Sequence, residues 1–155
     1  IDCDHDHQAF ENIAKGMGQE NYTLEILPGL DGDWYVKDSE KADEYSDSYG
    51  GWEVFSKYAF EGAFDDAFYD LETRSEQLLE NEILANLSNM NRVNILCTHD
   101  YLVVPLLAYI TDGHANLRYY EKRKWVNYLA GVAMIISPDG SVRYEPVKGL
   151  ETGLM

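Results

Sequence analysis

Cysteine is scarce in this chain of 155 residues, which has only Cys3 and Cys97. Two cysteines do not make the disulfide framework that stabilises small secreted domains. No apolar run reaches the roughly 20 residues that a transmembrane helix needs, so we expect no membrane partner. The first residues also lack the pattern of a signal peptide. These absences do not decide whether the protein is cytoplasmic, or periplasmic or extracellular.

Positive charge is scarce as well, because 12 Lys and Arg stand against 28 Asp and Glu, for a net charge of −16. Residues 1–91 carry five Lys and Arg against twenty-two Asp and Glu, whereas residues 92–155 carry seven against six. The neutral part contains a basic cluster of Arg118, Lys122, Arg123 and Lys124. A small phosphate ester suits such a cluster, but a nucleic acid would be repelled by the rest of the chain. We therefore expect no nucleic-acid partner.

Hydrophobic residues make up 45% of the chain and aromatic residues 13%, which indicates one folded domain over residues 1–155. The hydrophobic pattern predicts helices alternating with strands, which is typical of a three-layer α/β/α fold with a mostly parallel sheet. The expected helices are Gln8–Met17, one through Trp52 to Phe60, Leu71–Leu87 with Asp70 as N-cap, and one that starts after Asp100 and ends at Ile110. The expected strands are Tyr22–Leu27, Trp34–Val36, Val93–Thr98, Leu129–Ser137 and Val142–Val147. The polar stretch from Leu30 to Gly51 is expected to form a surface loop or lid.

The junction after the apolar run Val93–Thr98 is the strongest candidate for a functional site. It places His99 and Asp100 between a predicted strand and a predicted helix. Ligands of open α/β sheets bind at the carboxyl ends of strands, where helix N-termini attract anions. A purely structural interpretation also stays open. In it, His99 is a loop residue whose hydrogen bonds are made within the fold, and Asp100 only caps the helix.

A second candidate is the segment from Asp2 to His7. As a strand, it would place Cys3, His5 and His7 on one face, and His-x-His pairs on strands can hold zinc. The alternative is a solvated acidic terminus, which we favour because His99 and His114 are the only other histidines.

The sequence Cys97-Thr98-His99-Asp100, followed by Pro105-Leu106-Leu107, resembles the second histidine motif of the histidine phosphatase superfamily, in its acid-phosphatase branch. The resemblance extends to Glu11–Gly18, to Phe60-Glu61-Gly62 and to the segment from Trp125 through the Pro138-Asp139-Gly140 turn. It implies the phosphoglycerate mutase-like fold and a phosphate-monoester hydrolase that needs no cofactor and no metal. It implies that His99 contacts the phosphate and that Asp100 protonates the leaving alkoxide. The implied substrate-binding residues are Thr98, Arg118, Arg123 and Glu53.

The Arg-His-Gly motif, which carries the nucleophilic histidine of that family, does not occur in these 155 residues. The resemblance then implies a domain that lacks its first strand, either as the C-terminal portion of a phosphatase or as a degenerate relative. Three functions stay open: hydrolysis of phosphate monoesters, a catalytically silent module that binds a phosphate ligand or a protein, and metal-dependent hydrolysis through His5 and His7. The expected partner is a small phosphorylated substrate or inorganic phosphate, and self-association is left open.

Overall fold

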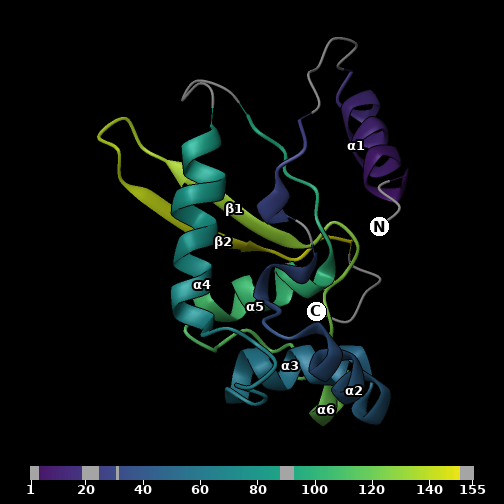
Figure 1. Cartoon of the computed structure of the whole chain (residues 1–155). Coiled ribbons are helices and arrows are strands. Elements are labelled where there is room, and N and C mark those ends of the chain that lie inside the picture. The colour runs from purple at the N-terminus through teal and green to yellow at the C-terminus, as the bar shows by residue number, and fades with distance from the viewer. Residues whose placement is uncertain (1–3, 19–24, 31, 88–92, 151–155) are drawn as a thin grey trace.

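The computed structural model describes residues 4–18, 25–30, 32–87 and 93–150. The helices of this part are α1 (Asp4–Gly16), α2 (Ser39–Tyr49), α3 (Gly51–Glu61), α4 (Leu71–Gln77), α5 (Asp100–Ile110) and α6 (Tyr119–Lys122). Its strands are β1 (Gly131–Ile136) and β2 (Val142–Val147). Shorter 3₁₀ turns span Pro28–Leu30, Gly32–Tyr35 and Leu84–Asn86, and a π-helical turn spans Leu78–Ile83. Figure 1 shows these elements along the chain.

The prediction of a three-layer fold with a mostly parallel sheet is wrong. The described residues are mostly helical, and their only sheet is the antiparallel pair of β1 and β2. Residues 93–98 form no strand, and Val93 is 82% exposed. Residues 34–36 form part of a 3₁₀ turn and a single bridge from Val36 to Phe68, while residues 25–27 are irregular. Residues 22–24 lie outside the described part.

The difference has a physical cause. A hairpin closes through a short turn, whereas a parallel pair needs a crossover of a dozen or more residues and a neighbour already in place. Residues 93–98 have the composition of a strand, but composition alone supplies no hydrogen-bonding partner. The hairpin prediction is confirmed, because β2 begins and ends as expected and β1 lies inside the expected range. Its turn closes with a 2.9 Å hydrogen bond from the Ser137 N–H to the Ser141 carbonyl.

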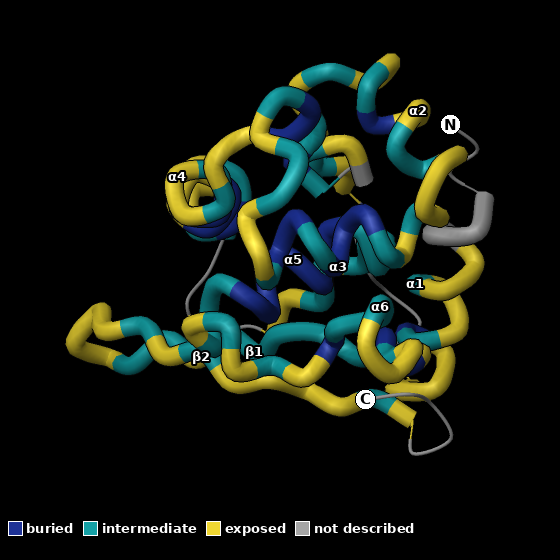
Figure 2. The backbone as a smooth tube through the Cα atoms, turned by 90° about the horizontal axis from the view of Figure 1, so that it is seen from below, coloured by how far each residue is buried: buried dark blue, intermediate teal, exposed yellow. Residues whose placement is uncertain are grey.

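Helix α5 forms the centre of the molecule, between the hairpin and α3 (Figures 1 and 2). Its residues Leu102, Val104 and Leu107 are buried, and they pack in one core with Val54 of α3. A helix that is apolar on nearly all sides needs this central place. The predicted helices through Trp52–Phe60 and up to Ile110 are therefore confirmed. None of the helices in the described ranges has the length and apolar character needed to cross a membrane.

The predicted helix Leu71–Leu87 lies where it was expected, but only its first part is an α-helix. Asp70 caps it as expected, because the Thr73 N–H donates to Asp70 Oδ1 at 2.9 Å. Leu78, Leu79 and Ile83 are buried in the core. The α-helical part ends at Gln77, and the π-helical and 3₁₀ turns carry the chain on to residue 86.

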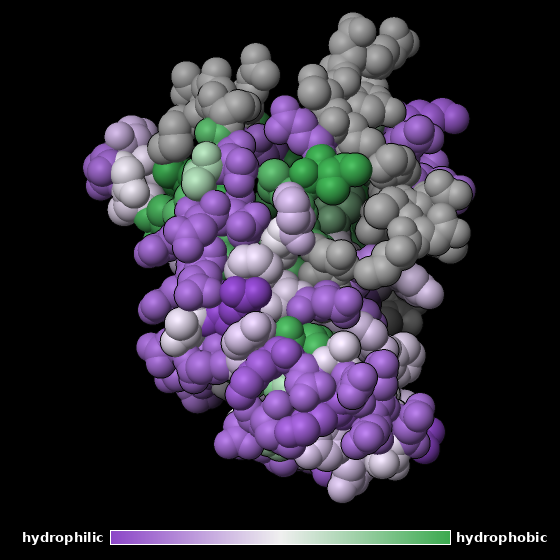
Figure 3. Space-filling model, viewed as in Figure 1, coloured by the Kyte–Doolittle hydropathy of each residue, from purple (hydrophilic) through white to green (hydrophobic). Residues whose placement is uncertain are grey.

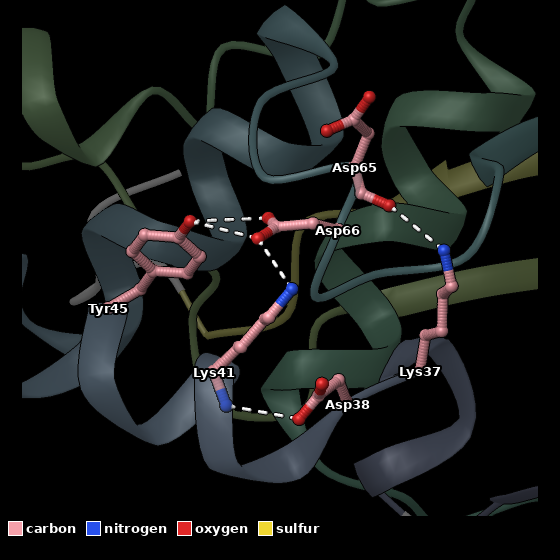
Figure 4. A network of polar contacts seen from close by, with 6 residues as sticks. All are labelled: Lys37, Asp38, Lys41, Tyr45, Asp65 and Asp66. Atoms are coloured by element: carbon pink, nitrogen blue, oxygen red, sulfur yellow. Dashed lines mark hydrogen bonds and ion pairs between the residues drawn. The ribbon is translucent and has the colours of Figure 1, made fainter.

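The expected surface loop or lid at residues 30–51 is wrong, because half of this range folds into α2. Asp38 caps this helix by accepting from the Lys41 N–H at 3.2 Å (Figure 4). Lys41 Nζ lies 3.0 Å from Asp66 Oδ2, and the Tyr45 hydroxyl donates to the same carboxylate. These contacts attach α2 to the segment that follows α3, so the acidic stretch packs against the body of the protein.

The hydropathy of the surface differs between the two ends of the molecule in the view of Figure 3. Figure 3 shows hydrophilic residues over the end formed by α2, α3 and α6, and hydrophobic residues mainly toward the other end.

Candidate functional site

The candidate site lies where the chain enters α5. His99 occupies the N-cap position with an extended backbone, and its carbonyl accepts from the N–H groups of Leu102 and Val103, both at 3.1 Å. The helix begins at Asp100, slightly earlier than predicted, so Pro105 lies in its second turn. Proline has no N–H, so the usual helical hydrogen bond to the Tyr101 carbonyl cannot form.

The Asp100 carboxylate is held by two donors. Oδ1 accepts from the Tyr101 N–H at 3.0 Å, and Oδ2 accepts from Trp125 Nε1 at 2.6 Å. One donor belongs to the first turn of the helix, and the other comes from 25 residues further along the chain. A negative side chain at a helix N-terminus is also stabilised by the helix dipole. The carboxylate therefore has a fixed orientation.

An aromatic cluster holds Trp125 in place. Trp125 is buried and stacks on Trp52, with ring centres 5.7 Å apart and an interplanar angle of 22°. Tyr119 and Tyr101 approach Trp125 edge-on, at 6.3 and 6.4 Å. Such a cluster fixes the orientation of an indole ring, while the indole N–H can still donate a hydrogen bond. The acceptor is Asp100.

Tyr101 connects Asp100 to α3. Its ring stacks on Phe55 at 4.4 Å and 10°, and burial raises the pKa of its hydroxyl, with a smaller contribution from the Asp100 charge. A Cβ atom on Gly51 would lie 2.7 Å from the Tyr101 hydroxyl oxygen. Glycine at the first position of α3 therefore permits this close approach.

Thr98, a predicted substrate-binding residue, makes a local structural contact. Its hydroxyl donates to the Leu30 carbonyl at 2.5 Å and joins the chain before α5 to the turn at Pro28–Leu30. The contact fixes the direction from which the chain enters α5.

For three other predicted substrate-binding residues, the described part of the structure gives no contact with Asp100. Glu53 forms an ion pair with Lys57 at 3.1 Å within α3. Arg118 donates to the Gly113 carbonyl at 3.2 Å, just past the C-terminal end of α5, while Asp100 lies at the other end. Since α5 has 11 residues, these ends are about 16 Å apart. Arg123 is exposed at the C-cap of α6, two residues before Trp125.

The segment with His5 and His7 is helical, so it does not form the strand that the metal hypothesis required. Helix α1 confirms the predicted helix at Gln8–Met17 but begins at Asp4. Residues two apart in an α-helix do not share a face, so the geometric argument for a metal pair at positions 5 and 7 fails. Within the described ranges, no group of three His, Cys, Asp or Glu side chains could hold a metal ion. Cys3 lies outside these ranges.

The contact between Trp125 and Asp100 was not predicted. A signal was present, because a buried tryptophan needs an acceptor for its indole N–H, and Trp125 follows a cluster of four basic residues. The sequence could not show which of the 28 acidic residues supplies that acceptor.

Comparison with protein-family models, with curated proteins and with solved structures finds no match to this chain. The function of the site must therefore be argued from its own residues.

Proposed function

We propose that this protein binds the phosphate group of a monoester at the start of α5, beside His99 and Asp100. In a catalytic form it hydrolyses the ester, and Asp100 gives its proton to the leaving alkoxide. The observation that carries the proposal is the Asp100 carboxylate, which Trp125 and the Tyr101 N–H hold beside the N-cap His99. The motif resemblance of Thr98-His99-Asp100 to the histidine phosphatases supports the same assignment.

The chemistry suits these residue types. A transferring phosphoryl group carries charge on its equatorial oxygens, which an imidazole can contact, and its leaving oxygen needs an acid. Lys124 immediately precedes Trp125, the residue that contacts Asp100, so one positive charge is next to this contact in the sequence. The nucleophile of the resembled family comes from an Arg-His-Gly motif, and these 155 residues contain none.

A silent binding module is the second candidate, and one observation favours it. Glu53 and Arg118 are engaged by Lys57 and Gly113, away from Asp100, so they do not complete a catalytic centre there. Both candidate functions require that the protein binds phosphate, and they differ in whether the bound ester is hydrolysed.

Binding is tested by thermal unfolding in the presence of inorganic phosphate or vanadate. A ligand that binds only the folded state at 100 times its Kd stabilises by about 2.7 kcal/mol, so the midpoint should rise by several degrees. His99→Ala should remove this rise. His114→Ala is the matched control, because His114 is exposed beyond the other end of α5, and this variant should keep the rise. An equal rise in wild type and His99→Ala would place the anion elsewhere.

Turnover is tested with p-nitrophenyl phosphate. The chain as given should hydrolyse it poorly or not at all, because the family's nucleophilic histidine is absent. When a segment with an Arg-His-Gly motif is supplied, activity should appear, and Asp100→Asn should lower kcat most for alkyl esters, whose leaving groups need protonation. Robust turnover by the chain alone that survives His99→Ala would refute the assignment. Turnover that a chelator removes and zinc restores would refute it as well.

A further inference from the structure

The hairpin of β1 and β2 has an inner face and an outer face that the register identifies. Val132, Met134 and Tyr144 pack against the core. Successive residues of a strand point to opposite faces, so the intervening residues point away from the core. The outer face therefore consists of the cross-strand pairs Gly131 with Val147, Ala133 with Glu145, and Ile135 with Arg143.

This outer face exposes apolar side chains. Ile135 and Val147 are 40% and 41% exposed, and Figure 2 shows α3, α4 and α5 on one side of the hairpin. Tyr128, Leu129 and Leu150 are exposed at its base, where the Leu150 N–H donates to the Tyr128 carbonyl at 2.9 Å. These residues are five of the twelve large hydrophobic residues found exposed in the described ranges. The hairpin and its base therefore carry a large share of the exposed hydrophobic residues of the described ranges.

The neutral charge of the hairpin suits a second copy of this acidic chain as its partner. Residues 126–150 contain two acidic and two basic residues, so they are neutral in a chain whose net charge is −16. Two copies that met through their acidic helices would repel each other. The hairpin allows two copies to meet with those helices kept apart.

The outer face also carries one charge of each sign. Arg143 Nη1 and Glu145 Oε1 form an exposed ion pair at 2.7 Å. In a twofold contact, residue i of one copy meets residue j of the other, and j meets i. An arginine and a glutamate on one face are therefore self-complementary, because Arg143 of each copy can meet Glu145 of the other.

We propose that the outer face of the β1–β2 hairpin is a homodimer interface, in which two copies pack sheet against sheet around a twofold axis. Ile135 and Val147 supply apolar contacts toward the two ends of this face, and Arg143 and Glu145 form reciprocal ion pairs between the copies. The proposal does not depend on the function of the α5 site.

The oligomeric state is measured by light scattering on a sizing column over a range of concentrations. Wild type should approach twice the chain mass of 17.7 kDa as concentration rises. Ile135→Asp should weaken the dimer by about tenfold or more, since it places an unpaired charge in the contact between the two sheets. Tyr49→Asp is the matched control, because Tyr49 is also exposed but ends α2 at the far end of the molecule, and this variant should dimerise like wild type.

Charge reversal gives a result that misfolding cannot imitate. Arg143→Glu and Glu145→Arg should each be monomeric alone, since each places like charges across the twofold axis. A mixture of the two variants should form a mixed dimer, because one then supplies two glutamates and the other two arginines. A wild type that stays monomeric at every concentration, a dimer that survives Ile135→Asp, or a mixture that stays monomeric would overturn the proposal.

Discussion

At the scale of single residues, Asp100 links two parts of the chain through one carboxylate. Its Oδ1 serves the first turn of α5, and its Oδ2 binds the indole of Trp125. The second contact spans 25 residues, so it closes the chain segment that contains α5 and α6. Asp100 is therefore a tertiary anchor as well as the candidate proton donor.

The contact between Trp125 and Asp100 should be measurable as a coupling energy. Trp125→Phe and Asp100→Asn should each destabilise the protein, and the double variant should lose less than the sum of the two. The coupling should be about 1–3 kcal/mol, because a hydrogen bond to a charged group contributes that much. Urea unfolding of the four proteins measures it. A coupling below about 0.5 kcal/mol would show that the 2.6 Å contact contributes little to stability in solution.

Two neighbouring buried tyrosines should respond in opposite ways to loss of the hydroxyl group. Tyr35 and Tyr58 have ring centres 5.9 Å apart, and Tyr35 shares a 3.0 Å hydrogen bond with Ser75. The Tyr58 hydroxyl is buried and has no hydrogen-bond partner in the described part of the structure. Tyr58→Phe should therefore stabilise the protein by about 1 kcal/mol, and Tyr35→Phe should destabilise it by a similar amount. The same sign for both variants in urea unfolding would contradict this account.

Burial raises the pKa of both tyrosines, so the pair also predicts alkaline unfolding. The folded state keeps these hydroxyl protons to a higher pH than the unfolded state does. Stability should therefore be complete below about pH 10, the unfolded pKa, and should fall as pH rises above it. Tyr58→Phe should reduce the fall, which urea unfolding at several alkaline pH values would detect.

At the scale of elements, the sequence predicted those structures whose contacts are local. Helices α1, α3 and α5 follow from the spacing of their apolar residues, and the hairpin follows from its Pro138-Asp139-Gly140 turn. The lid at residues 30–51 failed because the contact of Lys41 with Asp66 is tertiary and leaves no local pattern. The strand at residues 93–98 failed because its existence depends on a neighbouring strand. The helix that follows the His99–Asp100 junction was predicted, but the contact of Trp125 with Asp100 was not, because it too is tertiary.

The cap of α4 gives a prediction for one element. Asp70→Ala should destabilise the protein by about 1 kcal/mol near neutral pH, because the Thr73 N–H loses its acceptor. The hydrogen bonds from Thr73 lower the pKa of Asp70. The contribution of the charged cap is therefore present above about pH 4, the unfolded pKa, and is lost as pH falls below it. The difference between wild type and variant in urea unfolding should shrink in acid, and a difference that grew in acid would contradict this role.

At the scale of the whole molecule, charge is the dominant feature. Residues 1–91 carry a net charge of −17 and residues 92–155 a net charge of +1. The candidate phosphate site and the neutral hairpin both lie in the second part.

Self-repulsion of the acidic part should make stability depend on salt. Sodium chloride shortens the Debye length to about 8 Å at physiological ionic strength, so it screens exposed carboxylates from one another. The thermal midpoint should rise as salt increases from low ionic strength to about 0.15 M. A midpoint that falls over this range would mean that attractive surface ion pairs, such as that of Lys41 with Asp66, outweigh the repulsion.

The most direct test of the phosphate site is an NMR titration of the labelled protein with inorganic phosphate. The indole N–H of Trp125 donates to Asp100, whereas that of Trp34 donates to the Arg74 carbonyl, so the two signals form a built-in comparison. The account predicts a saturable shift of the Trp125 indole signal and of the Asp100 and Tyr101 amide signals, with the Trp34 signal unchanged. Shifts that do not saturate, or that are as large at Trp34 as at Trp125, would contradict a phosphate site at the start of α5.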